Sequence, residues 1–144
     1  MKFLTKIKLA LAFQTSLNYD AEKKYQKIID KLEKYRSFVE DEMKNTFPEF
    51  YILLGEAYFN ITNYRIAEGY LLKALETTKK DTKLNHDEIN YLNIHIYYWL
   101  YLTYKHLNDE AKAFQCSNLY RETTYNEKNI RRYIKNNFPC EETI

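Results

Sequence analysis

The sequence has little glycine, proline or cysteine and no long uncharged apolar run. Its 144 residues include two each of glycine, proline and cysteine. Glycine and proline interrupt helices, so their scarcity, together with lysine, glutamate, leucine and alanine recurring at helical spacing, favours helix. No segment alternates between apolar and polar residues for long enough to form a convincing strand. We therefore expect an all-α protein that forms a single domain over residues 1–144.

The cysteines and the apolar segments indicate the cellular location of the chain. Cys116 and Cys140 are far apart, so we expect no stabilising disulfide and a reduced, cytoplasmic setting. No run approaches about 18 uncharged apolar residues, so no membrane contact is expected. The opening segment turns from basic to apolar as a signal peptide does, but Lys6 and Lys8 interrupt it. We interpret this segment as part of the mature protein.

The charge is nearly balanced, because 22 basic and 20 acidic residues give a net charge of +2. This balance argues against a general polyanion binder. One basic stripe at helical spacing remains near the C-terminus, and it consists of Lys128, Arg131, Arg132 and Lys135. Such a stripe is typical of a solvated helix face, and it could also contact phosphate groups. A nucleic-acid-associated regulator is therefore one alternative, although nucleic acid is not the partner we expect.

The sequence contains no motif that is typical of a catalytic or metal-binding site. His86, His95 and His106 do not have paired ligand spacing, and no cysteine stands near them to complete a zinc site. The chain has no glycine-rich phosphate loop, and its carboxylates lie among lysines as on a solvated helix face. We expect no catalytic residues, no metal, no cofactor and no enzymatic activity.

Helix starts are predicted from capping patterns. In a capping box, a polar N-cap residue and a glutamate three residues later satisfy each other's backbone donors. The spacing occurs three times, at Thr46 with Glu49, Asn85 with Glu88, and Thr124 with Glu127. Pro48 adds to the first of these starts, since proline is favoured in the first turn of a helix.

An internal repeat organises the chain. Leu17–Ala21 and Leu107–Ala111 share the pattern Leu-Asn-x-acid-Ala, and residues 61–64 follow the same apolar-then-polar order. These expected turns begin 44 and 46 residues apart. The pattern predicts three helical hairpins, roughly 1–44, 45–84 and 85–125, and a capping helix at about 127–137, or about seven helices in all. Hairpins that cannot bury their apolar faces alone must stack, which predicts a short solenoid.

The segment 48–79 resembles a tetratricopeptide repeat, whose consensus places large, small and aromatic residues at fixed offsets. The matching positions are Tyr51, Leu54, Gly55, Tyr58, Ala67, Leu71 and Ala74. The physical interpretation is that Gly55 and Ala67 are small so that two antiparallel helices approach closely. Tyr58 would then fill the space beside them. The resemblance implies a right-handed, tetratricopeptide-like stack of hairpins.

The resemblance is weaker in the other two hairpins. The third keeps the spacing with Tyr97, Leu100, Tyr104 and Ala113, but Tyr101 stands at the glycine position and Ser117 at an aromatic position. We expect that hairpin to cross more openly. In the first hairpin Ile7, Ala10 and Leu11 are compatible with the pattern, while Gln14 and Lys23 occupy the aromatic and small positions.

The resemblance also implies a function. Members of this family are mostly non-catalytic and hold a peptide or partner segment in a concave groove lined by the first helix of each hairpin. The groove-facing offsets fall here on Ile52, Glu56, Phe59, Asn60, Tyr98, Leu102, Lys105 and His106. Ile52 and Glu56 replace the Lys and Asn of the clamp that some relatives use for a C-terminal carboxylate. The groove suits an amphipathic segment, or else packs against the N-terminal hairpin or its own loop.

The aromatic segment 90–106 is apolar nearly all round, so it is either central or interfacial. An exposed remainder would be a docking or homodimer face. The function predicted from the sequence is a small protein-binding adaptor. The main alternative is an immunity protein that neutralises one toxin by stoichiometric binding, motivated by the small domain without catalytic groups.

Overall fold

The chain is helical throughout the part that the structure describes. The computed structural model describes residues 2–44 and 46–125, and these ranges contain no strand. The elements are α1 (Lys2–Ala21), α2 (Tyr25–Leu32), a 3-10 turn η1 (Glu33–Tyr35), α3 (Arg36–Asp41), α4 (Pro48–Asn60), α5 (Tyr64–Lys80), α6 (His86–His106) and α7 (Glu110–Tyr125). The prediction of an all-α protein is confirmed.

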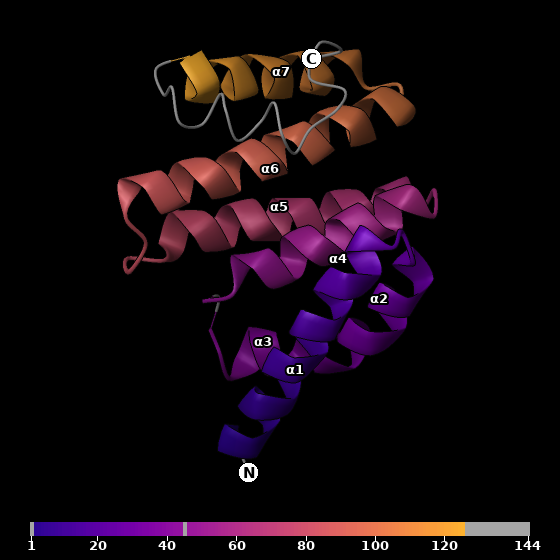
Figure 1. Cartoon of the computed structure of the whole chain (residues 1–144). Coiled ribbons are helices and arrows are strands. Elements are labelled where there is room, and N and C mark those ends of the chain that lie inside the picture. The colour runs from indigo at the N-terminus through magenta and orange to yellow at the C-terminus, as the bar shows by residue number, and fades with distance from the viewer. Residues whose placement is uncertain (1, 45, 126–144) are drawn as a thin grey trace.

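Successive helices pack against one another in chain order. Figure 1 shows the chain passing from α1 and α2 at one end of the view to α7 at the other. Short turns join α1 to α2, α4 to α5 and α6 to α7, and each pair is in contact. We call α1, α4 and α6 the first helices. Between the pairs, α2 packs on α4, and α6 packs on both α4 and α5.

Two of the three expected hairpin ranges each enclose one pair of helices. The ranges 45–84 and 85–125 enclose α4–α5 and α6–α7. In the range 1–44 the second part of the hairpin is divided into α2, η1 and α3, a division that the sequence pattern did not predict. The helix expected at about 127–137 lies outside the described residues.

The three turns within the pairs share one backbone conformation. Lys23, Thr62 and Asn108 have positive φ angles of 58°, 68° and 59°. Each donates its N–H to the carbonyl three residues earlier, and the next residue donates to the carbonyl five residues earlier. This double hydrogen bond is the Schellman motif that ends a helix. The turns are therefore equivalent, and 39 and 46 positions separate them.

The first turn predicted from the sequence is wrong, because α1 continues through Leu17–Ala21 and reverses only at Lys23. The alignment of the first pair with the second therefore differs by five residues from the alignment that the sequence predicts. Counting back 39 positions from Tyr51 and Gly55 gives Ala12 and Ser16, and both are buried. The residues that the sequence predicts at the packing positions of this pair are exposed instead: Ile7, Ala10, Leu11, Gln14 and Lys23.

Gly55 marks the close contact between α4 and α5 that the sequence predicts. A Cβ at this position would lie 2.7 Å from Leu71 Cγ, 2.8 Å from Leu71 Cδ2 and 3.5 Å from the Ala67 carbonyl oxygen. Leu71 and Ala67 are fully buried. Beside them the Tyr58 ring stacks on Tyr70 with centroids 5.6 Å apart. The prediction that Gly55 permits a close helix contact is confirmed.

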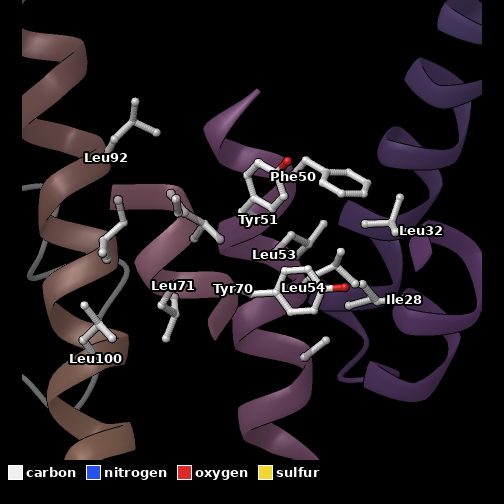
Figure 2. Packing of buried hydrophobic residues seen from close by; sticks show 14 of the residues in the cluster. Ile28, Leu32, Phe50, Tyr51, Leu53, Leu54, Tyr70, Leu71, Leu92 and Leu100 are labelled. Atoms are coloured by element: carbon white, nitrogen blue, oxygen red, sulfur yellow. The ribbon is translucent and has the colours of Figure 1, made fainter. Parts of the chain in front are cut away.

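One hydrophobic core runs through most of the described helices. In Figure 2 the side chains of Phe50, Tyr51 and Leu54 on α4 lie between Ile28 and Leu32 of α2 on one side and Leu92 and Leu100 of α6 on the other. A second cluster joins α6 to α7 and contains Ile94, Tyr97, Tyr98 and Tyr120. Because α6 contributes to both clusters, this aromatic helix is central within the described residues.

A half-buried carboxylate ties the first pair of helices to the second. The Tyr58 hydroxyl donates to Glu33 Oε1 at 2.8 Å, and the Tyr70 hydroxyl donates to the same oxygen. Arg36 Nη1 donates to Tyr70 Oη at 3.4 Å. Burial, and then the Glu33 carboxylate, raise the pKa of Tyr58 to about 12. This network joins η1 and α3 to α4 and α5.

The capping predictions have different outcomes. The Asn85 side chain accepts from the Glu88 N–H at 2.9 Å, as predicted for the start of α6. The prediction at Thr46 is wrong, because the N-cap of α4 is Phe47 and the Thr46 hydroxyl donates to the Met43 carbonyl. Pro48 does begin α4. Thr124 lies in the last turn of α7, and Glu127 lies outside the described residues.

The two glycines form a matched pair for testing the contact at Gly55. We expect Gly55→Ala to lower the free energy of unfolding, because overpacking against the buried Leu71 side chain costs about 1–3 kcal/mol, more than the gain in helix propensity. We expect Gly69→Ala to raise it by about 0.5–1 kcal/mol, since Gly69 is exposed and a Cβ there would meet nothing within 4 Å. Urea denaturation followed by circular dichroism measures both. Equal stabilisation by the two changes would contradict the close contact.

The Glu33 network predicts a second stability difference. Glu33→Ala leaves two tyrosine hydroxyls without their acceptor, so we expect a loss of about 1–3 kcal/mol in the free energy of unfolding. Glu33→Gln keeps an acceptor oxygen and removes the charge, so its loss should be smaller. We also expect Glu33→Gln to lower the pKa of Tyr58, as measured by absorbance titration of the tyrosines. An unchanged tyrosine titration would show that Glu33 does not act on these rings.

Candidate binding cavity between the first helices

A cavity of about 410 Å³ lies between α1, α4 and α6, the first helices of the three pairs. Ligand pockets commonly have volumes of about 300–1,000 Å³, so this one is large enough to hold several side chains. The first helix α1 contributes Phe13, Leu17 and Asp20 to its wall. The other lining residues are Glu49, Ile52, Leu53 and Glu56 of α4 and Tyr91, Leu92 and His95 of α6.

The corrected register explains which α1 residues reach the cavity. Counting back 39 positions from Ile52, Glu56 and Phe59 gives Phe13, Leu17 and Asp20, the three α1 residues in the wall. These are the groove-facing offsets that the tetratricopeptide resemblance implies. The sequence reasoning missed the three residues because it placed the first turn too early. The signal that would have found them is the shared backbone conformation of the turns, not a shared sequence motif.

Two of the predicted groove residues on α4 line the cavity, and two do not. Ile52 and Glu56 are part of its wall. The Phe59 ring instead packs against Trp99 and His106, with centroids 5.3 Å away in both cases. Asn60 is exposed, and its side-chain amide donates to the Glu56 carbonyl at 2.9 Å.

The predicted groove residues on α6 lie away from the cavity. Tyr98 is buried and packs against the rings of Trp99 and Tyr120. Leu102 is half-buried against the same cluster. Lys105 and His106 are exposed near the end of α6, where Lys105 forms an ion pair with Glu110 at 3.1 Å and His106 stacks on Tyr64. The cavity is reached instead by the first half of α6, through Tyr91, Leu92 and His95.

The basic stripe, the possible metal ligands and the cysteine thiol are the other candidates considered from the sequence. The basic stripe of Lys128, Arg131, Arg132 and Lys135 lies outside them. Within residues 2–44 and 46–125 no three histidine, cysteine or acidic side chains cluster as a metal site would require. Burial raises the pKa of the Cys116 thiol to about 11, so this thiol stays protonated near neutral pH.

Two carboxyl groups meet inside the cavity wall. Asp20, at the end of α1, and Glu56, on α4, both line this wall. Burial is the first cause that raises the pKa of Glu56 well above its usual value, and the neighbouring Asp20 carboxyl is the second. Asp20 Oδ1 is fully buried and accepts no hydrogen bond from the described residues.

The remaining titratable groups of the cavity are acidic or neutral. Glu49 lies at the rim, where partial desolvation of its carboxyl group raises its pKa, with smaller effects from Asp81 and Glu88. Burial lowers the pKa of His95 to about 4, so its imidazole is neutral at pH 7. Burial, and then the Glu56 and Asp20 carboxyl groups, raise the pKa of Tyr25 of α2.

The cavity therefore combines apolar walls with a carboxyl pair. Phe13, Leu17, Ile52, Leu53 and Leu92 can take apolar groups out of water. The carboxyl oxygens can accept hydrogen bonds from a donor that enters the cavity. This arrangement suits a ligand that is apolar over most of its surface and carries a hydrogen-bond donor at one point.

The comparisons with known proteins assign no family and no function to this cavity. No family model, no curated protein and no solved structure matches the chain. Within the described ranges no helix has both the length and the apolar character needed to cross a membrane.

The raised pKa of Glu56 predicts how stability depends on pH. Its ionisation is penalised in the folded state, so wild-type stability falls as the pH rises from 4.5, the ordinary value, through the higher pKa of folded Glu56. Glu56→Gln removes this penalty. We therefore expect Glu56→Gln to melt a few degrees above wild type at pH 7, and the difference to shrink as the pH falls toward the ordinary glutamate pKa.

Thermal unfolding of the two proteins over a pH series measures this difference. The low pKa of His95 is common to both proteins, so its effect cancels. The control is Glu76→Gln, because the pKa of Glu76 is lowered by Lys80 and its neutralisation should not stabilise the fold. A Glu56→Gln variant that melts below wild type at pH 7 would contradict the penalty assigned to Glu56.

Proposed function

We propose that the chain is a non-catalytic protein-interaction module that holds a peptide segment of a partner protein in the cavity between α1, α4 and α6. One observation carries the proposal: a single cavity receives side chains from the first helix of each of the three pairs. A binding surface assembled from equivalent faces of successive hairpins is the way helical-repeat proteins bind their partners.

A tetratricopeptide-like stack is part of this proposal. It is supported by burial at the positions that carry the resemblance, since Tyr51, Leu54, Ala67, Leu71 and Ala74 are fully buried. The contact at Gly55 adds to this support. The equivalent turns at Lys23, Thr62 and Asn108 extend the same organisation to all three pairs.

The size and lining of the cavity indicate the form of the partner. A volume of about 410 Å³ takes a few side chains and not a folded domain. Leu17 is exposed at 40% in the wall, so apolar surface is left open to a ligand. A segment that buries two or three apolar side chains in the cavity and keeps its other side in water fits this surface, as an amphipathic peptide does.

Two leucines on α1 provide a matched test. Leu17 lines the cavity, whereas Leu11 on the same helix is exposed and does not. Peptides are first selected from a random-peptide display library on the full wild-type chain. We expect Leu17→Trp, which fills the cavity, to weaken the selected peptides at least about tenfold, a loss of about 1.4 kcal/mol. Leu11→Trp should leave their affinity unchanged.

Isothermal titration calorimetry measures the affinities, and circular dichroism confirms that both variants are folded. Equal binding to wild type and to Leu17→Trp would show that the peptides use another face. Failure to select any peptide that discriminates the two proteins would contradict the proposed function.

A further inference from the structure

The carboxyl pair in the cavity lacks the partner that buried carboxylates normally have. Asp20 and Glu56 come from different helices and reach the same wall. Asp20 Oδ1 is buried without any hydrogen-bond donor among the described residues. Buried charged groups in proteins are usually paired with an opposite charge, because an unpaired one is costly.

We infer that the Asp20–Glu56 pair is the recognition site for one basic side chain, lysine or arginine, of the peptide segment that binds in the cavity. This inference rests on the proposed function and names the chemistry of its partner. The peptide is apolar on both sides of the basic residue, because Phe13, Leu17 and Ile52 form the adjacent wall.

The charges around the pair favour a cation. Glu49 on the rim adds a third acidic group, and none of the described residues that line the cavity is lysine or arginine. The titratable groups from the neighbouring helices are Tyr25 of α2 and Tyr91 and His95 of α6, and the imidazole of His95 is neutral at pH 7. A positive side chain that enters the cavity meets attraction from α1 and α4 without an opposing positive charge in the lining. The apolar walls strengthen this attraction by excluding water.

Arginine and lysine fit the pair better than a metal ion does. Two carboxyl groups can accept the parallel N–H groups of a guanidinium or the donors of an ammonium group. A metal ion would need further protein ligands, and the described residues hold no group of three candidate ligands. The basic group is therefore supplied by the peptide.

Binding of the cation favours the ionised form of Glu56. In the free protein, burial and then the neighbouring Asp20 raise the pKa of Glu56, whereas a bound cation favours loss of the Glu56 proton. The proton leaves to solvent. Affinity for a basic peptide consequently rises with pH, as Glu56 loses its proton more easily.

The test uses peptides selected from a random-peptide display library on the full chain, in forms that differ only in charge. Each selected arginine is replaced by citrulline, its neutral isostere, and each lysine by norleucine. We expect the neutral peptide to bind wild type about tenfold to a hundredfold more weakly. Glu56→Gln and Asp20→Asn should weaken the basic peptide to a similar extent, while Glu76→Gln should leave it unchanged.

Two further readouts separate recognition from a general structural effect. Glu56→Gln should bind the neutral peptide as well as wild type does. The neutral peptide has no charged group for Glu56 to attract, so in a double-mutant cycle the substitution removes nothing further. The rise of affinity with pH should flatten in Glu56→Gln. Circular dichroism and thermal unfolding confirm that each variant is folded.

The outcomes distinguish this inference from the proposed function. Peptides that are weakened by Leu17→Trp but bind equally in charged and neutral forms would overturn the inference and leave the binding cavity in place. Selected peptides that carry acidic groups and bind more tightly as the pH falls would also overturn it. If Leu17→Trp weakens no selected peptide, the proposed function fails and the inference fails with it.

Discussion

The close approach of α4 and α5 at Gly55 is the constraint on which the rest of the fold depends. A Cβ at this position would overlap Leu71, so the two helices can lie at their observed distance only because the side chain is missing. The pair α4–α5 then serves as the support for its neighbours, since α2 packs on α4 and α6 packs on both helices. The cavity borders α4 on the face that carries Ile52 and Glu56, where α1 and α6 complete its wall.

Two glutamates illustrate the difference between a carboxyl that has partners within the protein and one whose neighbour is a second carboxyl. Glu33 accepts hydrogen bonds from two tyrosine hydroxyls and lies near Arg36, so its half-buried carboxylate has partners within the protein and stabilises the contact between pairs. Glu56 has another carboxyl as its neighbour, and this arrangement penalises the free protein. A site that is unfavourable in the free state and lies in an apolar cavity is typical of functional residues.

The sequence predicts the features that depend on local residues and misses those that depend on tertiary packing. The helical class, the close contact at Gly55 and the N-cap at Asn85 all follow from residue type and spacing. The first turn does not, because Leu17–Ala21 has the composition of a turn while α1 continues to Lys23, a residue without the usual preference for positive φ. This error hid Phe13, Leu17 and Asp20. The pairing of Asp20 with Glu56 has no sequence signal, since it requires two helices to meet.

The central claim is that the cavity between the first helices is where a partner segment binds, and methyl NMR tests it most directly. A peptide selected on the full chain would be titrated into protein labelled at its leucine and isoleucine methyl groups. The account predicts that the signals of Leu17, Ile52 and Leu92 shift on binding, while those of Leu11 and Leu119, exposed elsewhere on the first and last described helices, do not. Shifts confined to Leu11 or Leu119, with the cavity methyl groups unmoved, would contradict it.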